Sequence, residues 1–307
     1  EVRDTVSLER GRHSIRVGAE WRRIFKGLSL GPATAGTYNF ASLAAFAADT
    51  PFKQTLNVDP STGLPTALPR YFHQFEYAAF LQDDWKVTRR LNLNIGVRND
   101  YYGPVAEKSG LLTSITWGPG DNYDQRLANA VAGRVQQAYK VPLLNLSPRV
   151  GLAWDPFGDG KTSVRTGFSM AYAPHHEQSI AGARPNPPDV IAGVIQPSVG
   201  IGTQILYGIP VPFNSQFARG LNSQGGLISR PGEPAIRISP WVVNPDIKTQ
   251  YSESWFFNVQ RQVHKDWTVE LGYVGTTGVN LERIDDINRR VGDLLDGKTD
   301  RINANFD

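Results

Sequence analysis

The chain has 307 residues, of which 40% are hydrophobic and 20% charged, a balance that excludes wholesale disorder. The formal net charge is only +3, and no run of Lys or Arg exceeds a pair, so the chain lacks the basic stripe of a nucleic-acid interface. It has no cysteine, which excludes disulfides and thiolate chemistry. No stretch approaches the roughly 18 consecutive apolar residues of a membrane-spanning helix.

Two hairpins are predicted in the first third of the chain. The first joins Val2–Leu8 to His13–Phe25, and the second joins Tyr71–Trp85 to Leu91–Tyr102. Between residues 91 and 98 every odd position is apolar and every even position is polar or glycine. Successive side chains of a strand point to opposite faces, so this pattern predicts strands with one apolar and one polar face.

Two further hairpins are predicted, from Ser147–Trp154 to Thr162–Tyr172 and from Tyr251–Val263 to Trp267–Val274. The turn of the third hairpin, residues 155–161, partly matches a nucleotide phosphate loop. However, Asp155 stands where that pattern needs a glycine, and an alternating strand follows where the phosphate site needs a helix. We therefore expect a hairpin turn there and no nucleotide site.

Long irregular segments separate the hairpins: Lys26–Arg70, Gly103–Leu146 and Pro174–Gln250. They far exceed the roughly 12–15 residues usual for loops of a compact soluble domain. Short turns at one end of the strands and long loops at the other are typical of an outer-membrane β-barrel. The predicted fold is all-β: an antiparallel transmembrane β-barrel segment of about eight strands in hairpins, with long extracellular loops.

Two of these loops are predicted to contain short helices. Leu127, Val131, Val135 and Tyr139 recur every four residues, which favours a helix over 125–140 that ends near a proline. Ser42 is placed to cap a shorter helical turn over residues 43–48. The third loop is rich in proline, and we expect no regular structure in it.

The strand patterns also predict what each face carries. The polar faces hold charged and amide side chains: Arg16, Glu20, Arg22, Glu76, Arg98, Arg149, Arg165, Asn258, Gln260 and Glu270. The apolar faces end in aromatics: Trp21, Trp85, Tyr101, Tyr102, Trp154, Tyr172, Trp255, Trp267 and Tyr273. Aromatic rings at strand ends suit a membrane–water interface, although they also cap the core of a soluble sheet.

No residues form a convincing catalytic, cofactor or metal site. His175, His176 and Glu177 are adjacent in a loop, but no second cluster at recognisable spacing would complete a metal site. Asp83 and Asp84 are successive strand residues, so we expect them on opposite faces and not as a catalytic carboxylate pair. The sequence therefore predicts neither an enzyme nor a cofactor.

Two hairpins resemble those of TonB-dependent outer-membrane receptors. Residues 80–87 (Phe-Leu-Gln-Asp-Asp-Trp-Lys-Val) with 91–98 carry one motif, and 147–165, from Ser-Pro-Arg-Val-Gly-Leu-Ala-Trp to Thr-Ser-Val-Arg, carry another. Tyr38-Asn39-Phe40 and the stretch from Tyr273 to Leu281 also fit, and the chain is most similar to the Oar-like, acidobacterial branch. The resemblance implies a bacterial outer-membrane barrel of about 22 strands with an N-terminal plug and TonB box.

On this resemblance we expect residues 1–307 to be part of one receptor barrel domain, a fragment without the plug and the barrel C-terminus. The full protein would import a scarce ligand such as a siderophore or saccharide. Its partners would be outer-membrane lipid, a TonB-type energy-transducing protein and a small-molecule or oligomeric ligand, with no nucleic acid. The loop aromatics and arginine proposed to contact that ligand are Trp117, Tyr123, Arg184, Tyr207 and Trp241.

Two alternatives remain open at this point. One is an outer-membrane adhesin or secretion-related barrel without transport, which a plug and TonB box upstream would exclude. The other is a soluble β-rich carbohydrate-binding protein or glycoside hydrolase, which would need shorter loops and, for hydrolysis, a spatial carboxylate pair.

Overall fold

The computed structural model describes residues 1–28, 36–66, 69–175, 180, 182–195, 220–223, 228, 240–288 and 302. Eight long strands make up most of one sheet: β1 (Val2–Arg10), β2 (His13–Leu28), β5 (Arg70–Lys86), β6 (Leu91–Tyr102), β10 (Leu146–Trp154), β11 (Thr162–Ala173), β13 (Gln250–His264) and β14 (Trp267–Val279). All four predicted hairpins are confirmed. Most of their strands continue a few residues past the predicted ends.

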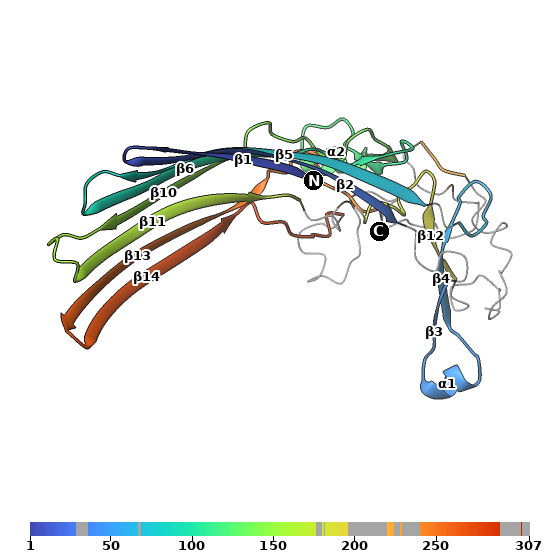
Figure 1. Ribbon diagram of the computed structural model, residues 1–307. Helices are drawn as coiled ribbons and strands as arrows, with labels where there is room; N and C mark the ends of the chain where they lie inside the picture. The colour runs from blue at the N-terminus through green and yellow to red at the C-terminus, as the bar shows by residue number, and fades with distance from the viewer. Residues whose placement is uncertain are drawn as a thin grey trace.

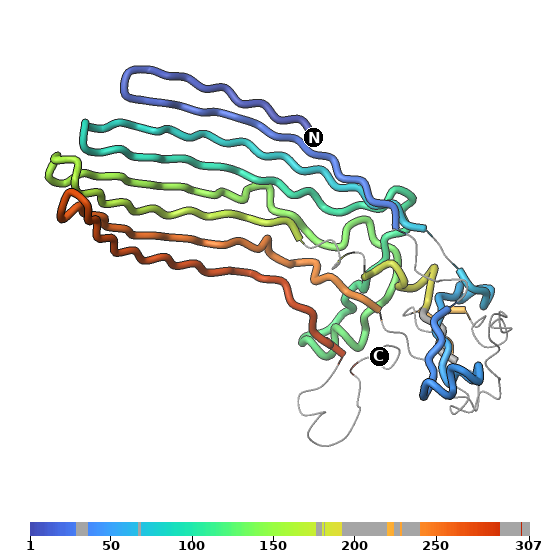
Figure 2. Tube along the Cα trace, turned by 60° about the horizontal axis from the view of Figure 1, so that its bottom comes forward, coloured from blue at the N-terminus to red at the C-terminus, as the bar shows by residue number. Residues whose placement is uncertain are grey.

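The strands follow one another through the sheet in chain order, each antiparallel to the next, from β1 to β14. The sheet is open and curved, with the tight hairpin turns together at one end and the long connections at the other (Figures 1 and 2). A short strand, β7 (Ala106–Glu107), pairs with β5 at the loop end. The described residues contain no helix that is long and apolar enough to span a bilayer.

One face of the sheet, here called the apolar face, exposes large hydrophobic side chains. Val17 and Leu81 are each 49% exposed, and Leu271 is 73% exposed. The register joins these residues into continuous rows, for example Val17 opposite Leu81 and Leu81 opposite Val97. A face this apolar and this exposed would be a large aggregation surface in water, whereas lipid covers it in a barrel wall.

Aromatic rows border the apolar face. Near the loop end Trp21 lies opposite Tyr77, and the rings of Tyr77 and Tyr101 stack at 5.2 Å. Near the turn end Trp85 stacks on His13 at 5.2 Å. Trp85 and Tyr77 are eight residues apart in β5, about 26 Å along a strand. This spacing matches the outward apolar band of outer-membrane barrels, about 25 Å tall between its aromatic girdles.

Tyr102 was predicted on the apolar face and lies instead on the opposite one. It pairs across the sheet with Glu76, and its hydroxyl donates a 2.9 Å hydrogen bond to the Tyr172 carbonyl. Tyr101 already occupies the apolar side of β6, and the strand alternation sends its neighbour to the other face.

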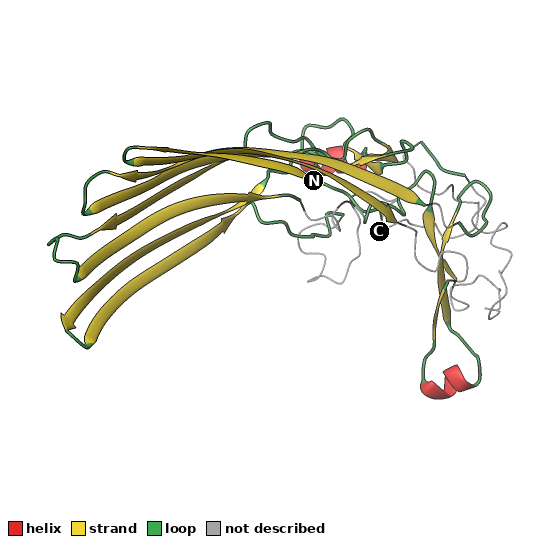
Figure 3. Cartoon of the chain, viewed as in Figure 1, coloured by secondary structure: helices red, strands yellow, loops and turns green. Residues whose placement is uncertain are grey.

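The long loops fold into a cap at the loop end of the sheet (Figure 3). It contains a three-stranded sheet of β3 (Thr37–Asn39), β4 (Lys53–Val58) and β12 (Ile191–Ile195), and a ribbon of β8 (Thr113–Thr116) and β9 (Val131–Arg134). One apolar cluster centres on Val58, Leu127 and Ile191, and a second centres on Phe72, Tyr139 and Ile180.

The helix predictions were half right. α1 (Leu43–Ala47) begins where expected, and its Ser42 hydroxyl accepts the Ala45 N–H at 3.1 Å. The helix predicted over 125–140 is wrong: α2 spans only Tyr123–Ala128, and β9 follows it. The prediction that the third loop has no regular structure is also wrong, because β12 pairs with β4. In both cases pairing with a distant strand satisfies the backbone and overrides the local pattern.

Candidate functional site

The face opposite the lipid-exposed one, here called the polar face, carries a network of ion pairs between β2, β5 and β6. Arg22 on β2 hydrogen-bonds Glu76 on β5, whose side chain is only 7% exposed. Arg98 on β6 reaches both Asp100, at 2.8 Å, and Glu20 on β2, at 3.3 Å. The Arg22–Glu76 pair joins the neighbouring strands β2 and β5, the Arg98–Glu20 pair reaches across β5, and the Arg98–Asp100 pair lies within β6. The two cross-strand pairs therefore support the strand register as well as the polar character of the wall.

A second part of the network lies nearer the hairpin turns. Arg16 donates to Asp84 at 2.6 Å, and the same carboxylate accepts from the Asn94 amide. Asp83, the preceding residue, lies on the apolar face and contacts His13 at 2.7 Å. The two carboxylates thus lie on opposite faces, as predicted, and do not form an acid–base pair.

The wall changes character at β10 and β11. Here the polar face consists mainly of glycine, serine and alanine, with two exposed arginines, Arg149 and Arg165. Neither arginine forms an ion pair within the part of the chain that the structure describes. Because the neighbouring side chains are small, a partner can approach the strands closely at this point.

A hollow of about 560 Å³ lies over the polar face. Its lining includes Arg16, Phe80, Arg98, Tyr102, Ser147 and Arg149. The hollow therefore joins the ion-pair network of β5 and β6 to the small-residue region of β10. Its charge and size suit a polar solute or a polypeptide segment and not a buried apolar ligand.

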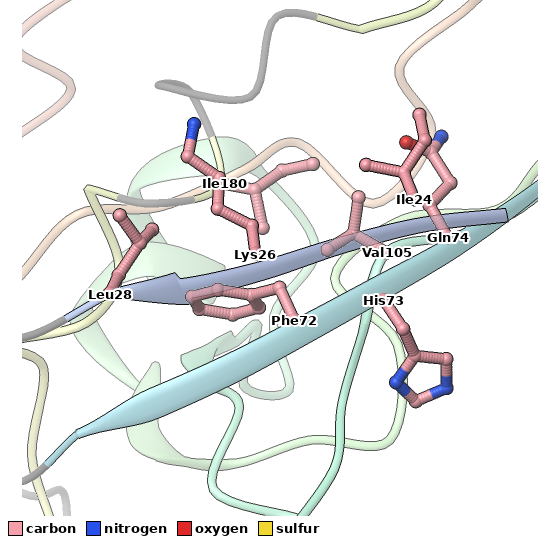
Figure 4. A pocket seen from close by; sticks show the side chains of 8 residues that line it. All are labelled: Ile24, Lys26, Leu28, Phe72, His73, Gln74, Val105 and Ile180. Atoms are coloured by element: carbon pink, nitrogen blue, oxygen red, sulfur yellow. The ribbon is translucent and has the colours of Figure 1, made fainter.

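A small apolar cavity of about 30 Å³ lies where the cap meets the sheet (Figure 4). Ile24, Phe72, Val105 and Ile180 surround it, and His73 points to the opposite side of β5. This volume holds about one or two water molecules at most, so the cavity is a packing gap between cap and wall.

Two of the predicted ligand contacts lie together in the cap. The rings of Trp117 and Tyr123 are 5.4 Å apart, and the Arg126 guanidinium lies 5.9 Å from the centre of the Trp117 ring. The Tyr123 hydroxyl donates a 3.1 Å hydrogen bond to the Ile287 carbonyl, on the segment after β14. The ring of Tyr123 is half exposed, so the pair presents an aromatic surface with a cation beside it.

The other predicted contacts lie in the third loop. The backbone of Trp241 is held by the side chain of Asn186, which donates to its carbonyl at 2.6 Å and accepts from its N–H at 2.7 Å. Arg184, two residues before Asn186 in the chain, is half-buried. Tyr207 lies outside the described residues.

Three long-range contacts in the cap were not found from the sequence. Asp189 pairs with Arg134 at 2.5 Å and lies 3.6 Å from the buried Arg70. His175 pairs with Glu282 at 2.7 Å, which ties the end of β11 to the segment after β14. These partners are 55 to 119 positions apart in the chain, and a single sequence carries no signal of such pairing.

The histidine cluster considered for a metal is not brought together with further ligands among the described residues. His175 is used in the pair with Glu282, and its ring meets Tyr139 edge-on at 4.8 Å. His176 and Glu177 lie outside the described residues. Burial raises the pKa of Tyr139 to about 12, so the Tyr139 phenol that contacts His175 is neutral at physiological pH.

The third hairpin turn is an ordinary Asx-type turn, as predicted. The Asp155 carboxylate accepts the backbone N–H groups of Gly158, at 2.8 Å, and Gly160, at 2.9 Å. These hydrogen bonds hold the pKa of Asp155 below its usual range, and the bond from Gly160 has the largest effect. Both glycines have positive φ, near 70°, which explains the residue choice without any phosphate ligand.

An exposed apolar face bounded by aromatic rows, with a polar opposite face and long loops at one end, defines a transmembrane β-barrel wall. The chain belongs to the outer membrane beta barrel domain family, whose sequence profile matches residues 1–306. It is also 26% identical over 198 residues to the TonB-dependent transporter Oar of Myxococcus xanthus. That match covers 60% of this chain but only 15% of the length of Oar.

Solved structures of two receptors are also similar. The hemophore receptor HasR of Serratia marcescens, solved as a double mutant with its hemophore HasA and heme, matches 87% of this chain and 34% of the receptor, with a TM-score of 0.30 and 11% identity. The alcaligin outer membrane receptor FauA from Bordetella pertussis matches 90% of this chain and 42% of the receptor, with a TM-score of 0.23 and 9% identity.

The sequence match to Oar confirms the predicted resemblance to TonB-dependent receptors. The protein is an outer-membrane β-barrel of a bacterium and is related to TonB-dependent receptors.

Proposed function

We propose that this chain is part of the barrel of a TonB-dependent transporter that imports a scarce ligand. The observation that carries the proposal is the polar hollow of about 560 Å³ on the inward face of a lipid-exposed wall. The transporter Oar, which this chain resembles, is named for the same activity.

In this proposal residues 1–307 form one part of a single barrel domain. A plug and an energy-coupling segment elsewhere in the full protein would contact a TonB-type partner in the periplasm. The folded cap would meet the ligand first, through Trp117 and Tyr123 and through Arg184, Tyr207 and Trp241. A small-molecule or oligomeric ligand would then pass along the polar face.

The test uses the full-length protein in its native host. Deletion of the gene should abolish growth on one member of a panel of iron–siderophore, cobalamin, saccharide and peptide sources. Deletion of the TonB-type partner should give the same defect. A barrel whose loss changes surface adhesion or secretion, and no growth phenotype, would instead support the adhesin or secretion alternative.

The cap contacts are tested with two variants of the same full-length protein. Trp117→Ala should weaken ligand binding about tenfold, because stacked aromatic anchors dominate such sites. Phe157→Ala is the matched control, since Phe157 is also an exposed aromatic (62%) but lies in the β10–β11 turn at the other end of the strands. Equal binding by both variants would remove Trp117 from the proposed site.

A further inference from the structure

A cluster of basic and aromatic side chains lies on the apolar face at the loop end of β2 and β5. The Arg23 guanidinium carbon lies 4.1 Å from the centre of the Phe25 ring and 5.0 Å from that of Phe75. His73 meets Phe75 edge-on at 6.0 Å. Strand pairing sets Arg23 opposite Phe75 and Phe25 opposite His73, so the four side chains alternate in two rows.

A third basic residue lies beside this cluster. The backbone N–H of Lys108 donates a 2.9 Å hydrogen bond to the carbonyl of Tyr71, two residues before His73. Glu107, the carboxylate next to Lys108 in the chain, is buried and accepts the N–H groups of Ser109 and Leu111. The cluster therefore has positive charge without an available carboxylate.

The opposite rim of the same face is arranged differently. There the outward-facing His13 contacts the Asp83 carboxylate at 2.7 Å and stacks on Trp85. At the loop end, by contrast, Arg23 and Lys108 form no ion pair within the described part of the chain. Both cations are therefore available to an anionic partner from outside the wall.

The position of the cluster identifies its surroundings. Arg23 follows Trp21 by one step on the same face of β2, and Trp21 belongs to the aromatic row of Tyr77 and Tyr101. Such a row marks the edge of the hydrocarbon layer. Because long loops of these barrels face the cell exterior, the cluster lies at headgroup depth in the outer leaflet.

We propose that this cluster binds the anionic, phosphate-bearing headgroup of an outer-leaflet membrane lipid. The two phenylalanine rings contact the Arg23 guanidinium through their faces, and its N–H groups can donate to phosphate oxygens. Charge-assisted hydrogen bonds of this kind are strong and directional. Lys108 adds charge beside the same headgroup, and His73 adds an N–H donor. The acyl chains of the lipid would cover the apolar face below. The inference is independent of the transport function.

The experiment measures binding of diphosphorylated lipid A to the purified full-length protein in zwitterionic detergent, by native mass spectrometry and titration. Arg23→Gln should weaken lipid A binding about tenfold, the usual effect of losing a hydrogen bond to a charged group. His73→Gln should weaken it less, about two- to threefold, and covers the case in which the first variant folds poorly. Arg165→Gln is the matched control, because Arg165 is also exposed and without an ion pair, but lies on the polar face.

The proposal predicts that Arg165→Gln binds lipid A like the parent and that millimolar inorganic phosphate does not displace the lipid. Equal affinity of the parent and Arg23→Gln would overturn it, as would parent binding of phosphatidylcholine as tight as that of lipid A. Full displacement by inorganic phosphate would show a soluble-anion site and would also overturn the assignment to a lipid.

Discussion

On the polar face one glycine packs so closely against an aromatic ring that adding a side chain there should destabilise the barrel. Gly18 on β2 lies under the ring of Phe80 on the neighbouring β5. A Cβ added at Gly18 would come within 2.5 Å of the Phe80 Cζ atom and 2.9 Å of the Asp4 carbonyl oxygen on β1. The ring can turn toward the hollow that it lines, but the Asp4 carbonyl is backbone and moves only if β1 and β2 separate.

Gly18→Ala should therefore destabilise the barrel by about 2 kcal/mol, the middle of the range for overpacking. This corresponds to about a 30-fold change in the folding equilibrium constant. The assay is urea-dependent folding of the full-length protein into lipid vesicles, followed by tryptophan fluorescence. Gly151→Ala is the matched control on the same face of β10, where the nearest atom to an added Cβ is an ordinary 3.5 Å away.

A second variant separates the two obstacles. If the Phe80 ring contributes, Gly18→Ala combined with Phe80→Leu should cost less than the sum of the two single changes. If only the Asp4 carbonyl matters, the two costs should add. The reasoning is refuted if Gly18→Ala costs no more than Gly151→Ala, because the close approach at Gly18 would then have no energetic consequence.

Three further outcomes are expected. Glu76→Gln should destabilise the barrel by about 1–3 kcal/mol in the same assay, because Arg22 loses its charged acceptor; an unchanged urea midpoint would contradict this. The raised pKa of Tyr139, about 12 against the ordinary 10.0, means that the folded cap keeps a proton that the unfolded chain releases. The Tyr139 contribution to cap stability should therefore be complete below pH 10 and fall as pH rises toward 12, as followed by limited proteolysis, and Tyr139→Phe should reduce that fall. Residues 1–307 expressed alone should aggregate, because β1 and β14 leave open sheet edges; a monomeric, cooperatively folding product in size-exclusion chromatography would contradict this.

The strands of the wall could be read from local patterns. Residues 91–98 alternate without exception, and β6 has the predicted bounds, Leu91–Tyr102. Side-chain alternation is a property of each strand itself, so it survives whatever the strand pairs with. The turn at Asp155 and the cap of α1 at Ser42 were also predictable, because both depend on hydrogen bonds within a few residues.

The cap was predictable only in part. Leu127 and Tyr139 were expected on one helix face, yet they pack in two different apolar clusters, and Val131 between them is 39% exposed. A four-residue recurrence is weak support for a helix when the segment can pair with a neighbouring strand. Here Ala132 lies opposite Ile115 in the β8–β9 ribbon, and Ile115 lies outside the segment 125–140 that carries the recurrence.

The sequence alone thus determined the strands, their two faces and the family, because these depend on residue periodicity and short motifs. Only the tertiary structure decided which distant residues meet: Asp189 with Arg134, His175 with Glu282, and the basic cluster of Arg23 and His73 across two strands. Such contacts depend on strand register and loop packing, and many sequences with the same periodicity would place other residues there.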